Sequence, residues 1–190
     1  MSEMPETELP ENDNNPFRTR CAMLVSLLAL VLAIASQGGN NASKEGTMQN
    51  ILASNAYAFY QAKNIRQTEY KIAADNLQLQ LQQDRLSPAA KEMLEKKLDD
   101  YKKTITRYES EPETGEGKKE LMAKAKAHEN QRDHALRQDP WFDHAEALLQ
   151  IAIVLTSVAI LTGAQVLFWI PMALGALGTL FTLNGYFLFF

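Results

Sequence analysis

Charged residues are absent from the last part of this 190-residue chain. From Ala147 to Phe190, 44 consecutive residues include no Asp, Glu, Lys, Arg or His, and a second uncharged stretch runs from Cys21 to Ser43. Soluble domains mix charged and apolar residues along the chain, so this segregation excludes an ordinary soluble domain. It predicts an all-α integral membrane protein, because apolar segments of this length are typical of membrane-spanning helices.

Cysteine and clustered basic residues are also scarce. The single cysteine, Cys21, cannot form an intramolecular disulfide or a thiolate metal site, which excludes a disulfide scaffold and a zinc module. The net charge is −4 and no long basic run is present. A nucleic-acid partner is therefore not expected, because neutralising phosphates requires clustered Lys and Arg.

Catalytic motifs are lacking as well. The sequence has no Gly-rich phosphate loop, no serine elbow and no paired carboxylates within its apolar segments. His134 and His144 are separated by a proline and share no helical face, so they are expected to be solvated surface residues. The alternative is a metal site at Asp143, His144 and Glu146 completed by a neighbouring subunit. We predict a non-enzymatic protein without a cofactor or metal.

The N-terminal part combines a polar arm with a short apolar segment. Residues 1–20 contain five acids and three prolines and are expected to be disordered. Residues 21–36 are predicted to form the first membrane span, and Gln37–Asn41 a loop. The small residues at Ala33 and Ala35 follow a short apolar stretch, so a cleaved signal peptide is the alternative.

The uncharged C-terminal segment is long enough for two spans. Helices over residues 141–163 and 166–190, joined by a tight turn at residues 162–165, are predicted to form a membrane hairpin. Gly175 and Gly178 begin small-residue pairs at four-residue spacing, which let helix backbones approach closely within the chain or between subunits.

Polar side chains within these spans are few. Glu146 at the membrane edge and Gln150 one turn deeper are expected to find polar partners on a neighbouring helix. Four further polar residues are expected to serve helix packing; the alternative is that they line the pore of an oligomeric channel. They are Thr156, Thr179, Thr182 and Asn184.

The middle of the chain is densely charged. Residues 44–146 contain 17 of the 19 basic and 18 of the 23 acidic residues, so a helical, coiled-coil-like domain over residues 44–140 is expected to lie in water. One apolar row recurs every seven positions, but polar residues fill its second seam position, which predicts a weak seam or one matched to particular partners. The row is Ile51, Ala58, Ile65, Ile72, Leu79 and Leu86.

Prolines and glycines divide this middle part into helices. Ser87-Pro88 and Asp139-Pro140 are typical helix starts, and a third helix is expected over residues 118–138. The helix after Pro88 has an apolar face with alternating spacings of four and three, which predicts packing against a partner helix. An antiparallel hairpin or short bundle is expected. The face is Leu94, Leu98, Tyr101, Ile105 and Tyr108.

Two motifs, Ala56–Gln67 (AYAFYQAKNIRQ) and Asp143–Leu155 (DHAEALLQIAIVL), carry a resemblance. Together they resemble the bacterial domain of unknown function 4337 family over roughly residues 17–188. The resemblance implies one N-terminal span, a charged helical middle and a C-terminal two-span hairpin, and it implies no activity. In the first motif Tyr60, Lys63 and Gln67 share a helical face and are predicted to lie at an interface, within the domain or with a partner.

Few charges decide the orientation. Arg18 and Arg20 favour a cytoplasmic N-terminus in the bacterial inner membrane, which would place the helical domain outside the cytoplasm. Basic residues near the second span favour the opposite orientation: Lys124, Lys126, Arg132 and Arg137.

The function predicted from these features is that of an oligomeric scaffold or accessory subunit of a bacterial envelope complex. Its expected partners are the lipid bilayer and either further copies of the chain or another membrane-complex subunit. A small oligomeric channel is the alternative.

Overall fold

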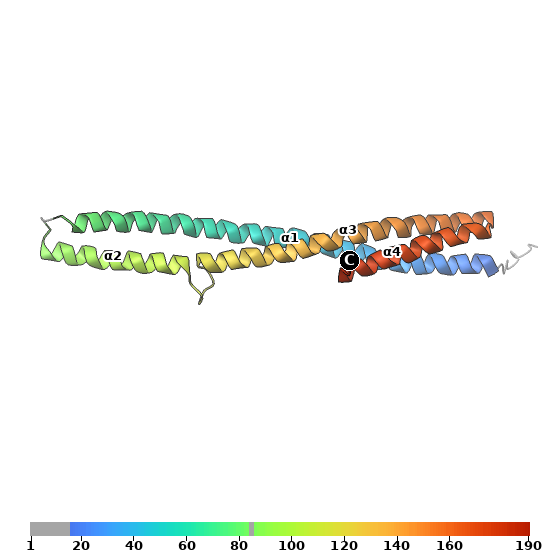
Figure 1. Ribbon diagram of the computed structural model, residues 1–190, viewed down its shortest axis with the longest axis horizontal. Coiled ribbons are helices and arrows are strands. Elements are labelled where there is room, and N and C mark those ends of the chain that lie inside the picture. Colours follow the sequence, from blue (N-terminus) through green and yellow to red (C-terminus); the bar gives the residue numbers. More distant parts are fainter. Residues whose placement is uncertain (1–15, 84–85) are drawn as a thin grey trace, which may run out of the picture. The chain divides into compact units, whose positions relative to one another are not determined.

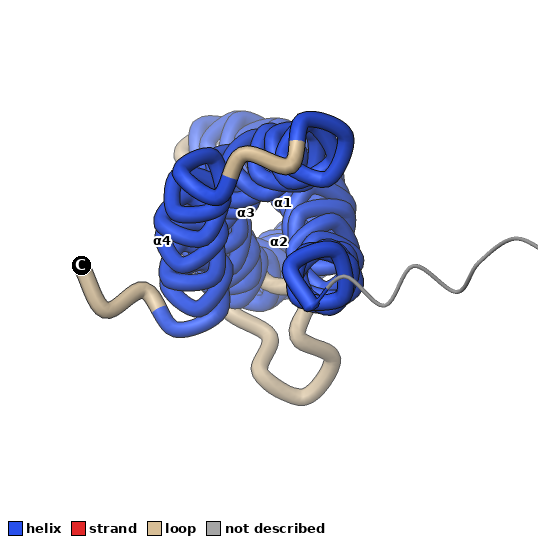
Figure 2. Tube along the Cα trace, turned by 90° about the vertical axis from the view of Figure 1, so that its right-hand side faces the viewer, coloured by secondary structure: helices blue, strands red, loops and turns tan. Residues whose placement is uncertain are grey.

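Helices account for nearly all of the described chain. The computed structural model describes residues 16–83 and 86–190, and these contain α-helices, one short 3-10 helix and no strand (Figures 1 and 2), which confirms the predicted all-helical fold. Residues 1–15 of the predicted arm lie outside the described part. In chain order the elements are α1 (Pro16–Leu81), α2 (Pro88–Glu109), α3 (Lys118–Thr162), η1 (Gln165–Phe168) and α4 (Trp169–Phe187).

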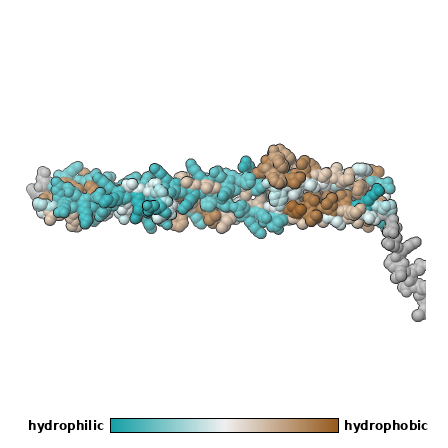
Figure 3. All heavy atoms as spheres, turned by 90° about the horizontal axis from the view of Figure 1, so that it is seen from below, coloured by the Kyte–Doolittle hydropathy of each residue, from teal (hydrophilic) through white to brown (hydrophobic). Residues whose placement is uncertain are grey.

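The chain divides into two compact units. Unit 1 comprises the chain up to Ser43 together with Leu136–Phe190, and unit 2 comprises Lys44–Ala135. Apolar side chains gather on the surface of unit 1, whereas hydrophilic side chains cover most of the visible surface of unit 2 (Figure 3). Three helices in the described part, α1, α3 and η1 with α4, are long and apolar enough to cross a membrane.

Unit 1 is built from parts of α1, α3 and α4, in which α1 and α4 run parallel to each other and α3 runs antiparallel to both. At one end the Phe17 and Phe168 rings meet edge to face at 6.2 Å, and towards the other end the Tyr186 hydroxyl donates to the Ile34 carbonyl at 3.2 Å. The predicted tight turn is present, with Gly163 at a φ of +67° that favours glycine. Small and apolar residues form the core: Leu28, Ala35, Ala145, Leu149 and Ala152.

The predicted loop at Gln37–Asn41 is wrong, because α1 continues through it without a break. Gly38 and Gly39 admit the Phe142 side chain of α3 instead of ending the helix. A Cβ on Gly38 would lie 2.5 Å from Phe142 Cε1, and one on Gly39 would lie 3.1 Å from Phe142 Cβ. Two glycines inside a helix therefore mark a close approach in this chain.

The predicted helix start at Asp139-Pro140 is also wrong, because Pro140 lies inside α3. Proline removes one backbone donor but does not forbid a helix whose flanking turns are packed. The Pro140 carbonyl is engaged by Nδ1 of His144, one turn further along. By contrast, the predicted start at Ser87-Pro88 is confirmed, since the Ser87 hydroxyl accepts from the Ala90 amide at 3.2 Å.

In unit 2, α1 packs against α3 along its first part and against α2 further along the chain. The side of α1 that faces these helices is a row with alternating spacings of three and four, here called the inner row. Its members are buried or half-buried: Ala53, Ala56, Tyr60, Lys63, Gln67, Tyr70, Ala74, Leu77 and Leu81. Alanines in this row let a second helix approach closely, and Tyr70 packs edge to face on Tyr101 and Tyr108 at 5.2 and 5.8 Å.

The heptad row predicted as a seam lies on the other side of α1. Ile51, Ile65, Ile72 and Leu79 are between 51% and 63% exposed, and Ala58 between them is exposed too. We call these five residues the outer row. A seven-residue repeat corresponds to about two helical turns, so the residues of the outer row stay on one side of α1. The outer row lies about half a turn away from the inner row, on the opposite side of the helix.

Candidate functional site

A polar network is buried where α1, the end of α2 and the start of α3 meet. Gln67, only 2% exposed, donates from Nε2 to the Ile105 carbonyl at 2.9 Å and to Glu109 Oε2 at 3.0 Å. Lys118 Nζ donates to Gln67 Oε1 at 2.8 Å and to Glu109 Oε2 at 3.2 Å. Every polar group of the Gln67 side chain is therefore engaged, as a buried amide requires.

Tyrosines flank this network. The Lys118 ammonium lies 5.7 Å from the centre of the Tyr60 ring, and the Lys63 ammonium lies 5.1 Å from the centre of the Tyr108 ring. Cations over aromatic faces are attracted by the ring quadrupole. Tyr60, Lys63 and Gln67, predicted to share an interface, thus face α2 and α3 of their own chain.

The loop between α2 and α3 holds the network in place. The Glu120 carboxylate accepts from the Ser110 hydroxyl at 2.6 Å and from the Glu111 amide at 3.1 Å. These two hydrogen bonds hold the pKa of Glu120 below its usual value. A side chain on Gly117 would collide with this bend, since its Cβ would lie 2.7 Å from Ser110 Cα.

Acid should weaken this site through Glu109. The hydrogen bond from Gln67, and after it the one from Lys118, lower the pKa of Glu109. A carboxylate whose pKa is lowered in the folded state stabilises the fold at any pH above the usual pKa of glutamate. This stabilisation is lost as the pH falls through the lowered pKa. We expect Glu109→Gln to flatten the decline in melting temperature of the full chain between about pH 6 and pH 3. Circular dichroism in detergent measures the melting temperature at each pH.

Glu113→Gln is the matched control for this pH prediction. Glu113 is exposed in the same loop region and forms no ion pair in the described part of the chain. Its variant should keep the wild-type pH profile. Equal flattening by both variants would contradict the role assigned to Glu109.

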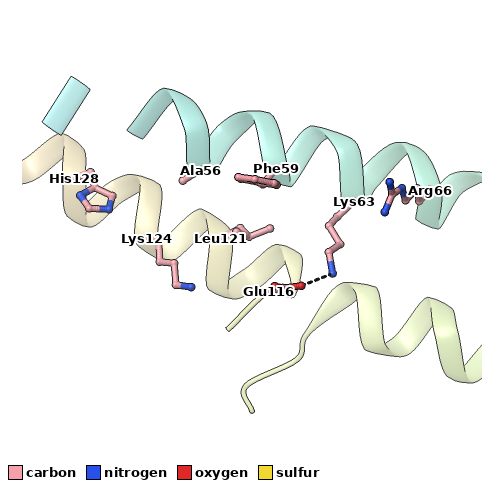
Figure 4. Close-up of a pocket in the computed structure, with 8 residues that line it drawn as sticks. All are labelled: Ala56, Phe59, Lys63, Arg66, Glu116, Leu121, Lys124 and His128. Atoms are coloured by element: carbon pink, nitrogen blue, oxygen red, sulfur yellow. Dashed lines mark hydrogen bonds and ion pairs between the residues drawn. The ribbon is translucent and has the colours of Figure 1, made fainter. Parts of the chain in front are cut away.

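The first motif also lines a groove between α1 and α3 in unit 2. The groove has a volume of about 420 Å³ and is lined by both apolar and basic side chains (Figure 4). Lys63 reaches across it, 3.5 Å from Glu116 and 3.9 Å from Glu111. Lys124 donates to the Gly115 carbonyl at 2.8 Å. The lining comprises Ala56, Phe59, Lys63, Arg66, Glu116, Leu121, Lys124 and His128.

The predicted face of α2 packs within unit 2. Leu98 joins Ala74 and Leu77 of α1 in a small buried cluster. Leu94, Tyr101 and Ile105 pack around that cluster, and Tyr108 lies against Tyr70. In the described structure all five residues of this face therefore contact their own chain.

The two glycines predicted to mediate close packing lie inside unit 1. Gly175 faces Leu28 of α1, and a Cβ on Gly178 would lie 2.8 Å from Leu149 Cγ and 3.3 Å from the Ala145 carbonyl oxygen of α3. Both glycines are buried. They allow α4 to approach both partner helices, as small residues do between helices in lipid.

The polar residues of the predicted spans bond to their own backbone. Thr156, Thr179 and Thr182 each donate to the carbonyl four residues earlier, at 2.7 to 2.9 Å. Asn184, fully buried, exchanges hydrogen bonds with the Phe190 carbonyl and amide at 3.1 and 3.2 Å. These contacts favour helix packing over a pore lining.

Glu146 and Gln150 form no hydrogen bond or ion pair among the described residues. Glu146 lies beside Gly39 in a polar hollow of about 420 Å³ that Asp139 and Asp143 also line. Asp139 precedes the predicted second span, and burial together with the Asp143 carboxylate raises its pKa. The described residues contain no group of three or more His, Cys, Asp or Glu side chains that could hold a metal ion. Gln150 is exposed on α3.

Nearly the whole chain matches a known protein family. Residues 17–188 match the domain of unknown function family DUF4337. The chain belongs to this family. No curated protein and no solved structure matches the chain. The resemblance predicted from Ala56–Gln67 and Asp143–Leu155 is therefore confirmed, and the DUF4337 region covers both units.

Sequence reasoning missed two features of this DUF4337 chain. Phe59 and Arg66 line the groove beside Lys63 but are not predicted above as site residues. They lie four residues before and three residues after Lys63, on the same side of α1. Phe142 is the second feature, because it is 2% exposed between glycines of two helices and no motif of the sequence marks it. The signal for it was the Gly38-Gly39 pair, which needed a bulky partner if the helix continued.

Proposed function

We propose that this chain is a non-enzymatic, membrane-anchored scaffold of the bacterial envelope that self-associates through the outer row of α1. The proposal is supported most strongly by that row. Five residues, mostly large and apolar, recur every seven positions on the side of α1 that its own chain leaves exposed. An apolar heptad row packs against a further helix, and polar residues at its second seam position match it to a particular partner.

Membrane anchoring is proposed from the three long apolar helices. Uncharged helices of about 20 residues cross the hydrocarbon layer, and Arg18 with Arg20 favours a cytoplasmic N-terminus in the inner membrane. In that orientation unit 2 lies outside the cytoplasm. Gln150, exposed within the second proposed span, gains a polar partner when a second copy packs there, as polar residues do between helices in lipid.

Unit 2 has little core of its own, which further supports self-association. Among its described residues the buried apolar side chains are three leucines, Leu77, Leu98 and Leu121, and several alanines. Two copies held in one membrane with the same orientation run parallel, so a two-fold contact places each outer-row residue opposite its counterpart. Covering the exposed isoleucines removes apolar surface from water, which is the main favourable term in association.

Disulfide cross-linking tests this proposal. In a Cys21→Ala background, which removes the only native cysteine, Ile65→Cys should form a covalent dimer under mild oxidation in native membranes. Cysteines whose Cα atoms lie within about 7 Å can form a disulfide, and facing seam positions meet this limit. Electrophoresis without reductant measures the yield.

Asn64→Cys in the same background is the control. Asn64 is the exposed neighbour of Ile65 but does not lie on the outer row, so little dimer should form. Glu69→Gln should raise the yield of the Ile65→Cys dimer, because Glu69 borders the row and would oppose its own counterpart. A monomeric mass in detergent together with equal yields from both cysteine positions would overturn the proposal.

A further inference from the structure

We infer that the groove between α1 and α3 is a binding site for a small organic anion that carries an apolar body, such as an aryl or acyl phosphate. This site is separate from the outer row and from the buried Gln67 network. It would stand even if the chain proved to be monomeric. The groove combines an excess of positive charge, an apolar floor and one acidic group that occupies it.

Positive charge is in excess around the groove. Lys63, Arg66 and Lys124 line it, and Glu116 is the only carboxylate among the lining residues. Arg66 forms no hydrogen bond or ion pair in the part of the chain that the structure describes, so its guanidinium is available. A guanidinium offers a planar fork of donors that matches a phosphate or carboxylate.

The floor of the groove is apolar. Leu121 is buried at 7% exposure, whereas the Phe59 ring is 64% exposed and lies along the groove near Leu121 (Figure 4). An exposed aromatic ring of this size is an apolar surface that a ligand can cover. A ligand with an apolar body would cover this ring while its anionic group meets the cations, which is the usual pattern of small-molecule sites.

Glu116 holds the place of the ligand's anion in this structure. Its carboxylate lies 3.5 Å from Lys63 Nζ, and its side chain is 66% exposed (Figure 4). Such an exposed ion pair contributes little stability, so a stronger anion can displace the carboxylate and let it move into water. Glu111, 3.9 Å from the same ammonium, remains in place and limits the excess charge at Lys63.

Titration calorimetry with the full chain in a zwitterionic detergent tests the inference. Phenyl phosphate and dihexanoyl phosphatidic acid are the two probes, since the first represents a soluble metabolite and the second a lipid. We expect at least one probe to bind. Arg66→Ala should weaken the binding of that probe by about tenfold or more, because the substitution removes a charge-assisted hydrogen bond. Phe59→Ala should weaken the binding of both probes but leave the binding of inorganic phosphate unchanged.

Lys71→Ala is the matched control, because Lys71 is an exposed cation on α1 that does not line the groove. Its variant should bind like wild type. Preference for phenyl phosphate would assign a soluble ligand, and preference for phosphatidic acid would assign a lipid headgroup. Absence of binding by both probes, or equal weakening by Arg66→Ala and Lys71→Ala, would overturn the inference. Circular dichroism verifies that each variant is folded.

Discussion

Replacing Phe142 with alanine should destabilise unit 1 by about 3 kcal/mol, near the lower end of the range for deleting a buried phenylalanine side chain. The ring is 2% exposed and fills the space left by two glycines on different helices. A Cβ on Gly38 would lie 2.5 Å from Phe142 Cε1, and one on Gly185 would lie 2.7 Å from the same atom. Truncation to alanine leaves a cavity between these helices, because the surroundings relax only partly. In lipid this loss of stability comes mainly from the packing contacts of the ring, because the transfer of an apolar side chain out of water contributes less there.

The free energy of unfolding in mixed micelles measures this effect. Phe187→Ala is the control, because Phe187 lies on α4 but is 65% exposed, and its removal should change stability by less than about 0.5 kcal/mol. Gly185→Val should destabilise as well, since the added side chain collides with the Phe142 ring. Similar effects of Phe142→Ala and Phe187→Ala would show that the ring is not the centre of the packing.

The apolar segments, the helix after Pro88 and the helical class could all be predicted from the sequence. Each depends on local composition or on the period of one element, which neighbouring residues determine. Gln37–Asn41 and Pro140 could not be predicted correctly. Glycine and proline favour breaks in isolation, but here the fit of Phe142 between glycines and the packed turns around Pro140 outweigh that preference.

The choice of seam on α1 could not be predicted from hydrophobicity. The outer row carries isoleucines and leucine, so it outranks the inner row, which contains Lys63 and Gln67. The inner row faces the chain's own helices because its alanines permit close approach and its polar residues meet specific partners, such as Glu109 and Lys118. Those partners lie about 40 to 50 positions away in the sequence. One result of this arrangement is that the more apolar row remains exposed on the other side of the helix.

Gln67→Leu should lower the stability of the α1 and α2 contact by about 1–3 kcal/mol, the usual effect of leaving buried polar groups without partners. Leucine keeps the volume near that of glutamine but can neither donate to Glu109 nor accept from Lys118. The Lys118 side chain is only 11% exposed, so water replaces the lost acceptor poorly. Hydrogen exchange of the α2 amides in the full chain measures the effect, because exchange reports local opening.

Gln61→Leu provides the control, since Gln61 is exposed on the same helix and the same atoms are replaced. It should change protection by less than about 0.5 kcal/mol. Combining Gln67→Leu with Lys118→Met should recover part of the loss, because the ammonium no longer needs an acceptor, while Glu109, 45% exposed, can be hydrated. Additive losses in the double variant would instead mean that the amide and the ammonium stabilise unit 2 independently.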